Sequence, residues 1–208
     1  IASDVHGKNH HIDGSIANFI EEISLIIDKQ VINCSINNNN KLFVDTIGGM
    51  GLTGTIIQAK IKLLKVSTSY IKQETIPTIN LQETMEVFRK NLNAKYIVAW
   101  IDCFTKGKNF GRSIIFKGEH AELEDIHSAG IKNPIKIEKK SKLTLLFPFP
   151  NFVLNKFSIR LFNKYFFFKN RFNKNKLLSY HDYFYPLDFL NNWNLMYGKK
   201  GFVQYQFV

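Results

Sequence analysis

The sequence predicts an α+β protein in two parts, residues 1–66 and 67–208. Three observations support this class. Predicted strands and helices do not alternate as they do in a doubly wound βαβ fold. Residues 55–66 alternate apolar and polar side chains, which is typical of a half-buried strand. Beyond the boundary, further strands over 96–104 and 111–117 indicate an antiparallel sheet.

The first part is expected to hold several short elements. The helix begins after the polar run 37–40, which offers good N-cap chemistry, and ends at Gly48-Gly49. In the last strand, Ile57, Ala59 and Ile61 are expected on the buried face. The order is a loop, a turn, two strands joined at Asp28-Lys29, a helix and a strand, over residues 1–13, 14–19, 22–27, 30–35, 41–47 and 55–66.

The second part carries weaker signals. Residues 67–81 are polar and contain Pro77, which suggests a crossover connection. Residues 81–93 fit a helix with an apolar stripe that includes Met85 and Phe88. Residues 118–142 are expected to form a charged loop, and the rest is aromatic and irregular until a strand begins at Phe202.

Composition limits the function classes. Of the 208 residues, 45% are apolar, so a packed core is expected and wholesale disorder is not. Cys34 and Cys103 are too few for a disulfide framework, which favours a reducing compartment and a cytoplasmic location, extending to the inner membrane surface. The most apolar run, 143–154, is too short to cross a bilayer.

The net charge of +11 is concentrated in 132–142 and 156–176, and the second run interleaves cations with aromatic rings. A composition rich in Lys, Asn, Ile and Phe explains such runs without any partner. Peripheral contact with an anionic membrane is the main alternative. Single-stranded nucleic acid would suit the same residues, but no nucleic-acid module is recognisable and no such partner is expected.

Two segments carry the chemistry. Residues 49–54 match G-x-G-x-x-G, but a predicted helix precedes them and a strand follows, the reverse of a dinucleotide fingerprint. They suit a helix cap, or a turn whose bare backbone approaches a ligand. In the opening segment, His6, His10 and His11 lie beside Asp4, but their spacing matches no helical metal motif, and we expect no metal.

These segments resemble motifs of one enzyme family. Residues 3–15 (SDVHGKNHHIDGS), 46–54 (TIGGMGLTG) and 201–208 (GFVQYQFV) occur in the order found in FAD-linked oxidases of the vanillyl-alcohol-oxidase superfamily, in the group similar to decaprenylphosphoryl-ribose oxidases. The resemblance implies that residues 1–66 are the C-terminal part of a PCMH-type FAD-binding domain. It implies that 67–208 are most of an antiparallel-sheet substrate domain.

The resemblance also implies roles for residues. FAD would contact the backbone and side chains of the opening segment and the glycine turn, with His6 as the one titratable catalytic candidate near the flavin. Substrate would contact Trp100, Phe184, Gln204 and Gln206; relatives carry tyrosine where Phe184 stands. The cofactor residues implied are Ser3, Asp4, Val5, His6, Gly7, Gly51 and Ile56.

The implied reaction is oxidation of a secondary alcohol of a sugar, carried on a polyprenyl phosphate, by hydride transfer to flavin N5. A short-chain dehydrogenase/reductase partner would complete an epimerisation in cell-wall sugar biosynthesis. Alternatives are a sugar-1,4-lactone oxidase and a non-catalytic, basic membrane-surface fragment. Because the chain starts inside one motif and stops in another, we expect an internal fragment, with the family's lysine beyond Val208.

Overall fold

The computed structural model describes residues 1–203 except 138–142, 151, 173–174 and 200; residues 204–208 also lie outside the description. The described chain forms two compact units, Ile1–Lys65 and Val66–Val208. Both combine helices with antiparallel sheets, so the expected α+β class is confirmed at this level. No described helix is long and apolar enough to cross a membrane.

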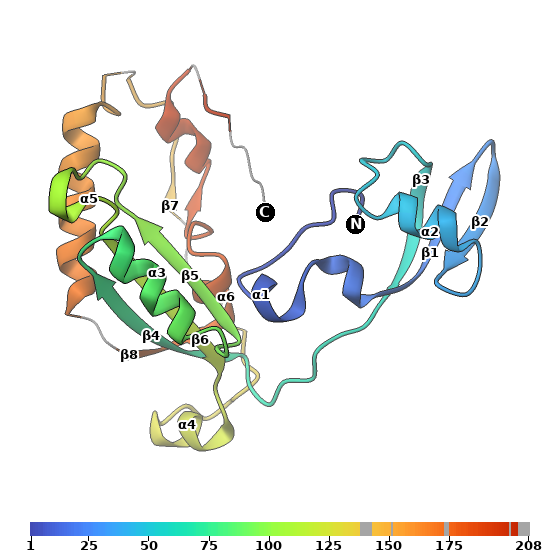
Figure 1. Ribbon diagram of the computed structural model, residues 1–208, viewed down its shortest axis with the longest axis horizontal. Helices are drawn as coiled ribbons and strands as arrows, with labels where there is room; N and C mark the ends of the chain where they lie inside the picture. Colours follow the sequence, from blue (N-terminus) through green and yellow to red (C-terminus); the bar gives the residue numbers. More distant parts are fainter. Residues whose placement is uncertain (138–142, 151, 173–174, 200, 204–208) are drawn as a thin grey trace. The chain divides into compact units, whose positions relative to one another are not determined.

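The first unit is built on a three-stranded antiparallel sheet in the order β2-β1-β3 (Figure 1). Its hairpin turn is Asp28-Lys29, and both residues have positive φ, as a two-residue turn with the twist of its strands requires. The elements are α1 (His10–Asp13), η1 (Ile16–Phe19), β1 (Ile20–Ile27), β2 (Gln30–Ser35), α2 (Asn40–Thr46) and β3 (Thr55–Ile61).

The core of this unit lies between the sheet and α2. Ile23 and Leu25 of β1 and Cys34 of β2 are fully buried, and Phe43 of α2 closes over them. Burial of such side chains stabilises by about 1.5–3 kcal/mol each. Two expectations were wrong here: the segments 1–13 and 14–19 contain the short helices α1 and η1 instead of only a loop and a turn.

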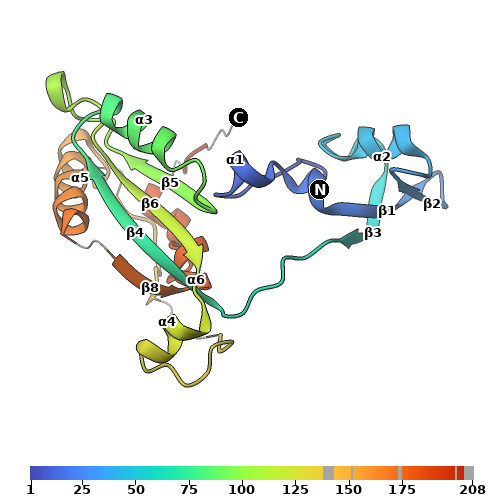
Figure 2. The same cartoon turned by 60° about the horizontal axis from the view of Figure 1, so that its bottom comes forward.

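The second unit is built on a four-stranded antiparallel sheet in the order β5-β6-β4-β8, with a short parallel pair, β7-β9, beside it. Figure 2 shows the long central strands β4 and β6 at the middle of this sheet. The elements are β4 (Tyr70–Thr78), α3 (Leu81–Lys90), β5 (Tyr96–Ile101), η2 (Gly107–Asn109), β6 (Ser113–His120), α4 (Leu123–Ser128), β7 (Leu143–Thr144), α5 (Lys156–Arg171), β8 (Asn175–Ser179), α6 (Tyr180–Phe184), β9 (Leu190–Asn191) and η3 (Trp193–Tyr197).

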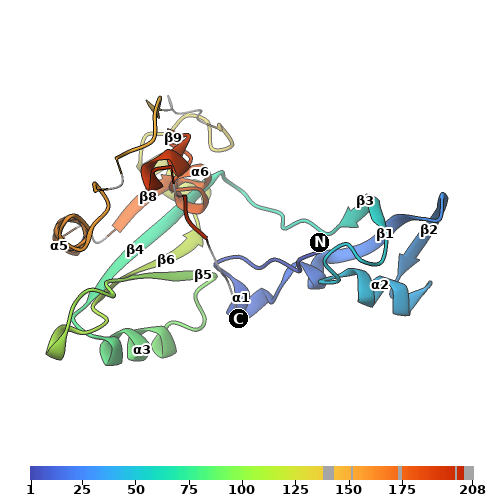
Figure 3. The ribbon, with the colours of Figure 1, turned by 90° about the horizontal axis from the view of Figure 1, so that it is seen from above.

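Helices α3 and α5 cover opposite faces of this sheet (Figure 3). Thr78 faces α3, since its hydroxyl lies 2.7 Å from the hydroxyl of Thr84. Trp100 pairs with Ile114, the residue that follows the partner of Thr78 on β6. Trp100 faces α5, where its ring lies 4.8 Å from that of Phe166. Side chains at adjacent register positions point to opposite faces of a sheet, so α3 and α5 contact different sets of strand side chains.

The structure corrects the expected crossover over 67–81, which is the central strand β4. Proline argues against a central strand because it cannot donate a ladder hydrogen bond. However, β8 as described pairs with Tyr70–Glu74, so among the described residues Pro77 lies where β4 has β6 as its single neighbour. Two further expectations were wrong: the segment 118–142 contains α4, and the aromatic region after it contains α5, β8 and α6.

Candidate functional site

The opening segment and the glycine turn lie side by side in the first unit. The N–H of Gly48 donates to the carbonyl oxygen of Ile1 at 3.2 Å, and the N–H of Met50 donates to that of Ala2 at 2.8 Å. The glycine turn is therefore joined through backbone hydrogen bonds to the two residues that precede the motif at residues 3–15. The exposed residues of the opening segment and of the glycine turn make up the candidate cofactor site.

Asp4 shapes the opening segment. Its φ is +41°, a left-handed conformation that Asp tolerates better than most residues. Its Oδ1 accepts the N–H of Ala17 at 3.1 Å, in the first turn of η1. One carboxylate oxygen thus satisfies an orphan helix donor.

The segment from Val5 to Gly7 is tied to the start of η1. Ile16 donates its N–H to the carbonyl oxygen of Val5 at 2.9 Å, and His6 forms an isolated bridge with Ser15. The His6 ring is partly exposed and lies 4.8 Å from the His10 ring. The side chains of Ser3 and Val5 and the backbone of Gly7 are exposed, so these predicted cofactor residues are accessible.

Lys8 adds a cation to this segment. Burial lowers the pKa of its ammonium, because the charged form loses water.

Among the described residues, no group of three or more His, Cys, Asp or Glu side chains is arranged to hold a metal ion.

The glycine turn owes its shape to positive φ angles. Gly48, Met50 and Gly51 have φ of +79°, +53° and +80°. An ideal Cβ on Gly51 would meet no atom within 4 Å, so the exposed backbone there faces open space. The hydroxyls of Thr46 and Thr53 lie 2.9 Å apart and close the turn. The turn therefore presents bare backbone on a fixed frame, which suits close approach of a ligand.

Ile56, a further predicted cofactor residue, packs against the hydrophobic core of the first unit. It pairs with Leu25, and the register shifts between this pair and Ser24–Gln58. This bulge places Ile57 outward, with 49% of its surface exposed. Ile61 is 41% exposed, so the expected inward positions of Ile57 and Ile61 were both wrong.

Two predicted substrate residues lie on one face of the second sheet, the face of α5. Trp100 is at one end of β5, and Phe184 packs edge-on against Tyr96 at the other end, with ring centroids 4.9 Å apart. Phe184 also lines an apolar pocket of about 270 Å³ with His120 and Tyr180. The structure does not bring Trp100 and Phe184 into contact; it places them along one strand.

The predicted residues Gln204 and Gln206 lie outside the described residues. A strand was expected to start at Phe202. Of its residues the structure describes Phe202 and Val203, and neither is in a strand, so the expected start was wrong. The Phe202 ring instead stacks near Tyr197, with centroids 4.1 Å apart.

Sequence reasoning missed a polar cluster beside Phe184. Tyr96 Oη lies 2.9 Å from His120 Nε2, while His120 Nδ1 is buried with no hydrogen-bond partner among the described residues. Burial, followed by the charge of Lys95, lowers the pKa of His120. Burial raises the pKa of the neighbouring Tyr183. These residues come from three separate elements, so no local motif could have revealed them.

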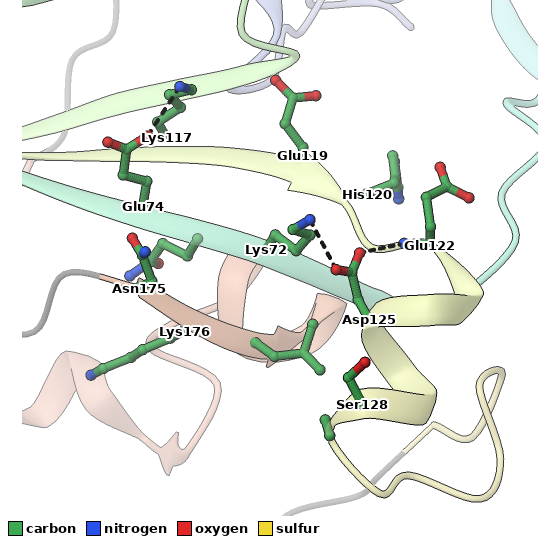
Figure 4. A pocket seen from close by; sticks show the side chains of 13 residues that line it. Lys72, Glu74, Lys117, Glu119, His120, Glu122, Asp125, Ser128, Asn175 and Lys176 are labelled. Atoms are coloured by element: carbon green, nitrogen blue, oxygen red, sulfur yellow. Dashed lines mark hydrogen bonds and ion pairs between the residues drawn. The ribbon is translucent and has the colours of Figure 1, made fainter.

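A second missed feature is an open, charged pocket of about 790 Å³ on the other face of the sheet, the face of α3 (Figure 4). Lys72 pairs with Asp125 at 2.9 Å, and Lys117 pairs with Glu74 at 3.0 Å. None of the predicted site residues within the described part of the chain lines it. Three lysines and four carboxylates line it, so it offers no clear preference for a charged ligand.

Comparison with known proteins identifies relatives of the chain. The chain is 34% identical, over its whole length, to "Decaprenylphosphoryl-beta-D-ribose oxidase" of Mycolicibacterium smegmatis. The chain is a relative of this oxidase. The resemblance read from the motifs is thereby confirmed, and it extends through the middle of the chain, where motifs were lacking.

A second relative is "Uncharacterized protein in mprA 5'region" of Streptomyces coelicolor, 27% identical over 65% of the chain. The chain spans 46% of the oxidase and the match covers 37% of the Streptomyces protein, so it corresponds to less than half of the length of either. No family model matches the chain.

Proposed function

We propose that the chain is part of an FAD-dependent oxidoreductase that acts on a CH–OH group of a sugar. The observation that carries this proposal is the 34% identity to the mycobacterial oxidase over the whole chain. The joined opening segment and glycine turn support it from within the structure. In this view, Ile1–Lys65 is part of a PCMH-type FAD-binding domain, and Val66–Val208 is part of a substrate domain.

The first unit has features that fit FAD. The exposed residues Ser3, Val5, Gly7 and Gly51 would contact the diphosphate and the flavin edge, and each charge-assisted bond that a backbone N–H donates there would stabilise by about 1.5–3 kcal/mol. Asp4 and Ile56 would hold the frame of this surface from the inside. His6 would lie near the flavin ring, on the side where the substrate binds. When bound, FAD supplies the acceptor for the hydride, at flavin N5.

The substrate proposed is a sugar carried on a polyprenyl phosphate, as the name of the mycobacterial relative suggests for that enzyme. Trp100 and Phe184 would form its apolar wall, and Gln204 and Gln206 would hydrogen-bond its hydroxyls. We further propose that a short-chain dehydrogenase/reductase reduces the keto sugar and so completes an epimerisation. A sugar-1,4-lactone oxidase is the second candidate, because it would use the same cofactor site.

Flavin content tests the proposal. The full-length protein that contains this chain should be yellow, and acid precipitation should release its FAD into the supernatant. The isolated chain should bind FAD weakly, because part of the cofactor shell would lie in the rest of the protein. Colourless, well-folded full-length protein, or flavin that stays in the acid pellet, would contradict non-covalent FAD binding.

Substrate class is tested separately. Anaerobic mixing of the yellow protein with a polyprenyl-phosphoryl pentose should bleach the flavin, and an aldono-1,4-lactone should not. Bleaching by the lactone alone would favour the second candidate.

A further inference from the structure

The outward face of α5 carries a continuous apolar stripe. Five large side chains recur at spacings of three and four residues, and at about 100° per residue they fall within a sector about 80° wide. All are exposed: Phe157 by 76%, Leu161 by 60%, Tyr165 by 60%, Phe168 by 43% and the C-cap residue Phe172 by 78%.

The stripe is not the face by which α5 packs on its sheet. Asn163 and Phe167, on the opposite side of the helix, are buried. Asn163 Nδ2 donates to Asp102 Oδ1 at 2.8 Å, and the Arg112 guanidinium lies 4.6 Å from the Phe167 ring centre. Because this inner face already secures the helix, the outer stripe serves nothing in the core of the unit.

Cations flank the stripe. Arg160, Lys164 and Arg171 follow one side of it, and Lys169 lies on the other. The helix has no acidic residue. Arg160, Lys164 and Arg171 form no ion pair with any residue in the described part of the chain. The outer face therefore combines apolar bulk with unneutralised positive charge.

We propose that this face of α5 docks on the surface of an anionic lipid bilayer. A helix lying in the interface buries Phe and Leu side chains at the headgroup boundary while flanking Lys and Arg side chains meet anionic lipids. The charge pattern disfavours a second copy of this chain, which would bring its own net charge of +11. Single-stranded nucleic acid would need rings set in a groove, whereas this stripe is convex and includes Leu161.

Vesicle co-sedimentation of the full-length protein tests this docking. The protein should bind vesicles of phosphatidylcholine and phosphatidylglycerol (about 3:1) and not pure phosphatidylcholine, and salt should weaken the binding. Replacing Phe157, Leu161 and Phe168 together by Ser should weaken the binding by roughly tenfold or more. The charge reversal R160E/K164E should weaken it to a similar degree, roughly tenfold.

Matched controls lie on α3 and just after it. R89E/K90E changes two exposed cations, and Met85→Ser with Leu92→Ser changes two exposed apolar side chains. Both should bind vesicles as the wild type does. The proposal would be overturned if the wild type did not bind the vesicles, or if the controls lost as much binding as the α5 variants. It would also be overturned if the α5 variants lost binding to a single-stranded oligonucleotide and not to vesicles. Flavin content is independent of this result, so failure here leaves the proposed oxidoreductase untouched.

Discussion

The N–H of Met50 donates to the carbonyl oxygen of Ala2 across 2.8 Å, and this bond ties the glycine turn to the first residues of the chain. Met50 holds a positive φ of +53° to make it. The conformation of either segment is therefore set partly by the other. A substitution in the turn should act on the opening segment as well, and this gives the proposed cofactor site a sharp test.

Gly51→Ala should lower FAD content much more than it lowers stability. An added Cβ meets no atom of the protein, so the cost within the chain is the strain of a positive φ, about 1–2 kcal/mol. Gly130→Ala is the matched control, because Gly130 also has positive φ and open space around it, but lies in the second unit. Equal flavin content in the two purified full-length variants would contradict a ligand at Gly51.

Asp102→Ala should strongly destabilise the protein. The carboxylate is 1% exposed and accepts from Arg112 and Asn163, which would be left without an acceptor. Loss of one partner of a buried pair costs about 3–5 kcal/mol. The control Glu74→Ala, which breaks a surface pair with Lys117, should cost about 1 kcal/mol or less. Urea denaturation measures both losses of stability. Similar midpoints for the two variants would contradict the prediction that Asp102 contributes more to stability than Glu74.

His120 should make stability depend on pH. Burial lowers its pKa in the folded state below the ordinary value of 6.5, so the unfolded chain binds the proton more readily. The stabilisation that neutral His120 contributes to the folded state is complete above pH 6.5. It is lost as the pH falls from 6.5 toward the lowered pKa of the folded state. The free energy of unfolding of the wild type should therefore fall more than that of His120→Gln between about pH 7.5 and about pH 5.5. Parallel curves would show that His120 is not involved.

Gly118→Ala should disturb the aromatic cluster around Tyr183. An ideal Cβ there would lie 2.5 Å from Tyr183 Cζ and Oη, so the ring must move, at a cost of about 1–3 kcal/mol. In a Tyr183→Ala background the same substitution should cost much less. A double-mutant cycle by thermal unfolding measures the difference, and additive effects would show that the two residues are not coupled.

The sequence predicted the elements whose signals are local. The β1-β2 hairpin, expected from two strands joined at Asp28-Lys29, is confirmed, and so is α3, expected from its apolar stripe. The structure adds the N-cap of α3, where Asn80 accepts the N–H of Glu83. Helix α5 was missed because phenylalanines occur on both its faces. Phe167 is buried and Phe168 is exposed, so the apolar period is hidden in the sequence.

The candidate site divides in the same way. The motifs around Ser3 and Gly51 could be found because each is contiguous. The hydrogen bonds from Gly48 and Met50 to Ile1 and Ala2 join residues far apart in the sequence, so no local pattern predicts them. The cluster of Tyr96, His120 and Tyr183 had no signal, since its members meet only when β5, β6 and α6 pack together. Roles for the predicted site residues stay predictions until flavin and substrate are measured.

The pairing of Tyr70 with Ser179 has a consequence for synthesis of the protein. Strand β4 leaves the ribosome long before β8, and at about 5–20 residues per second the wait is on the order of 5–20 s. During this time one edge of β4 is open and can pair with another nascent chain. Premature termination between the two strands should therefore yield aggregates more readily than termination after Ser179.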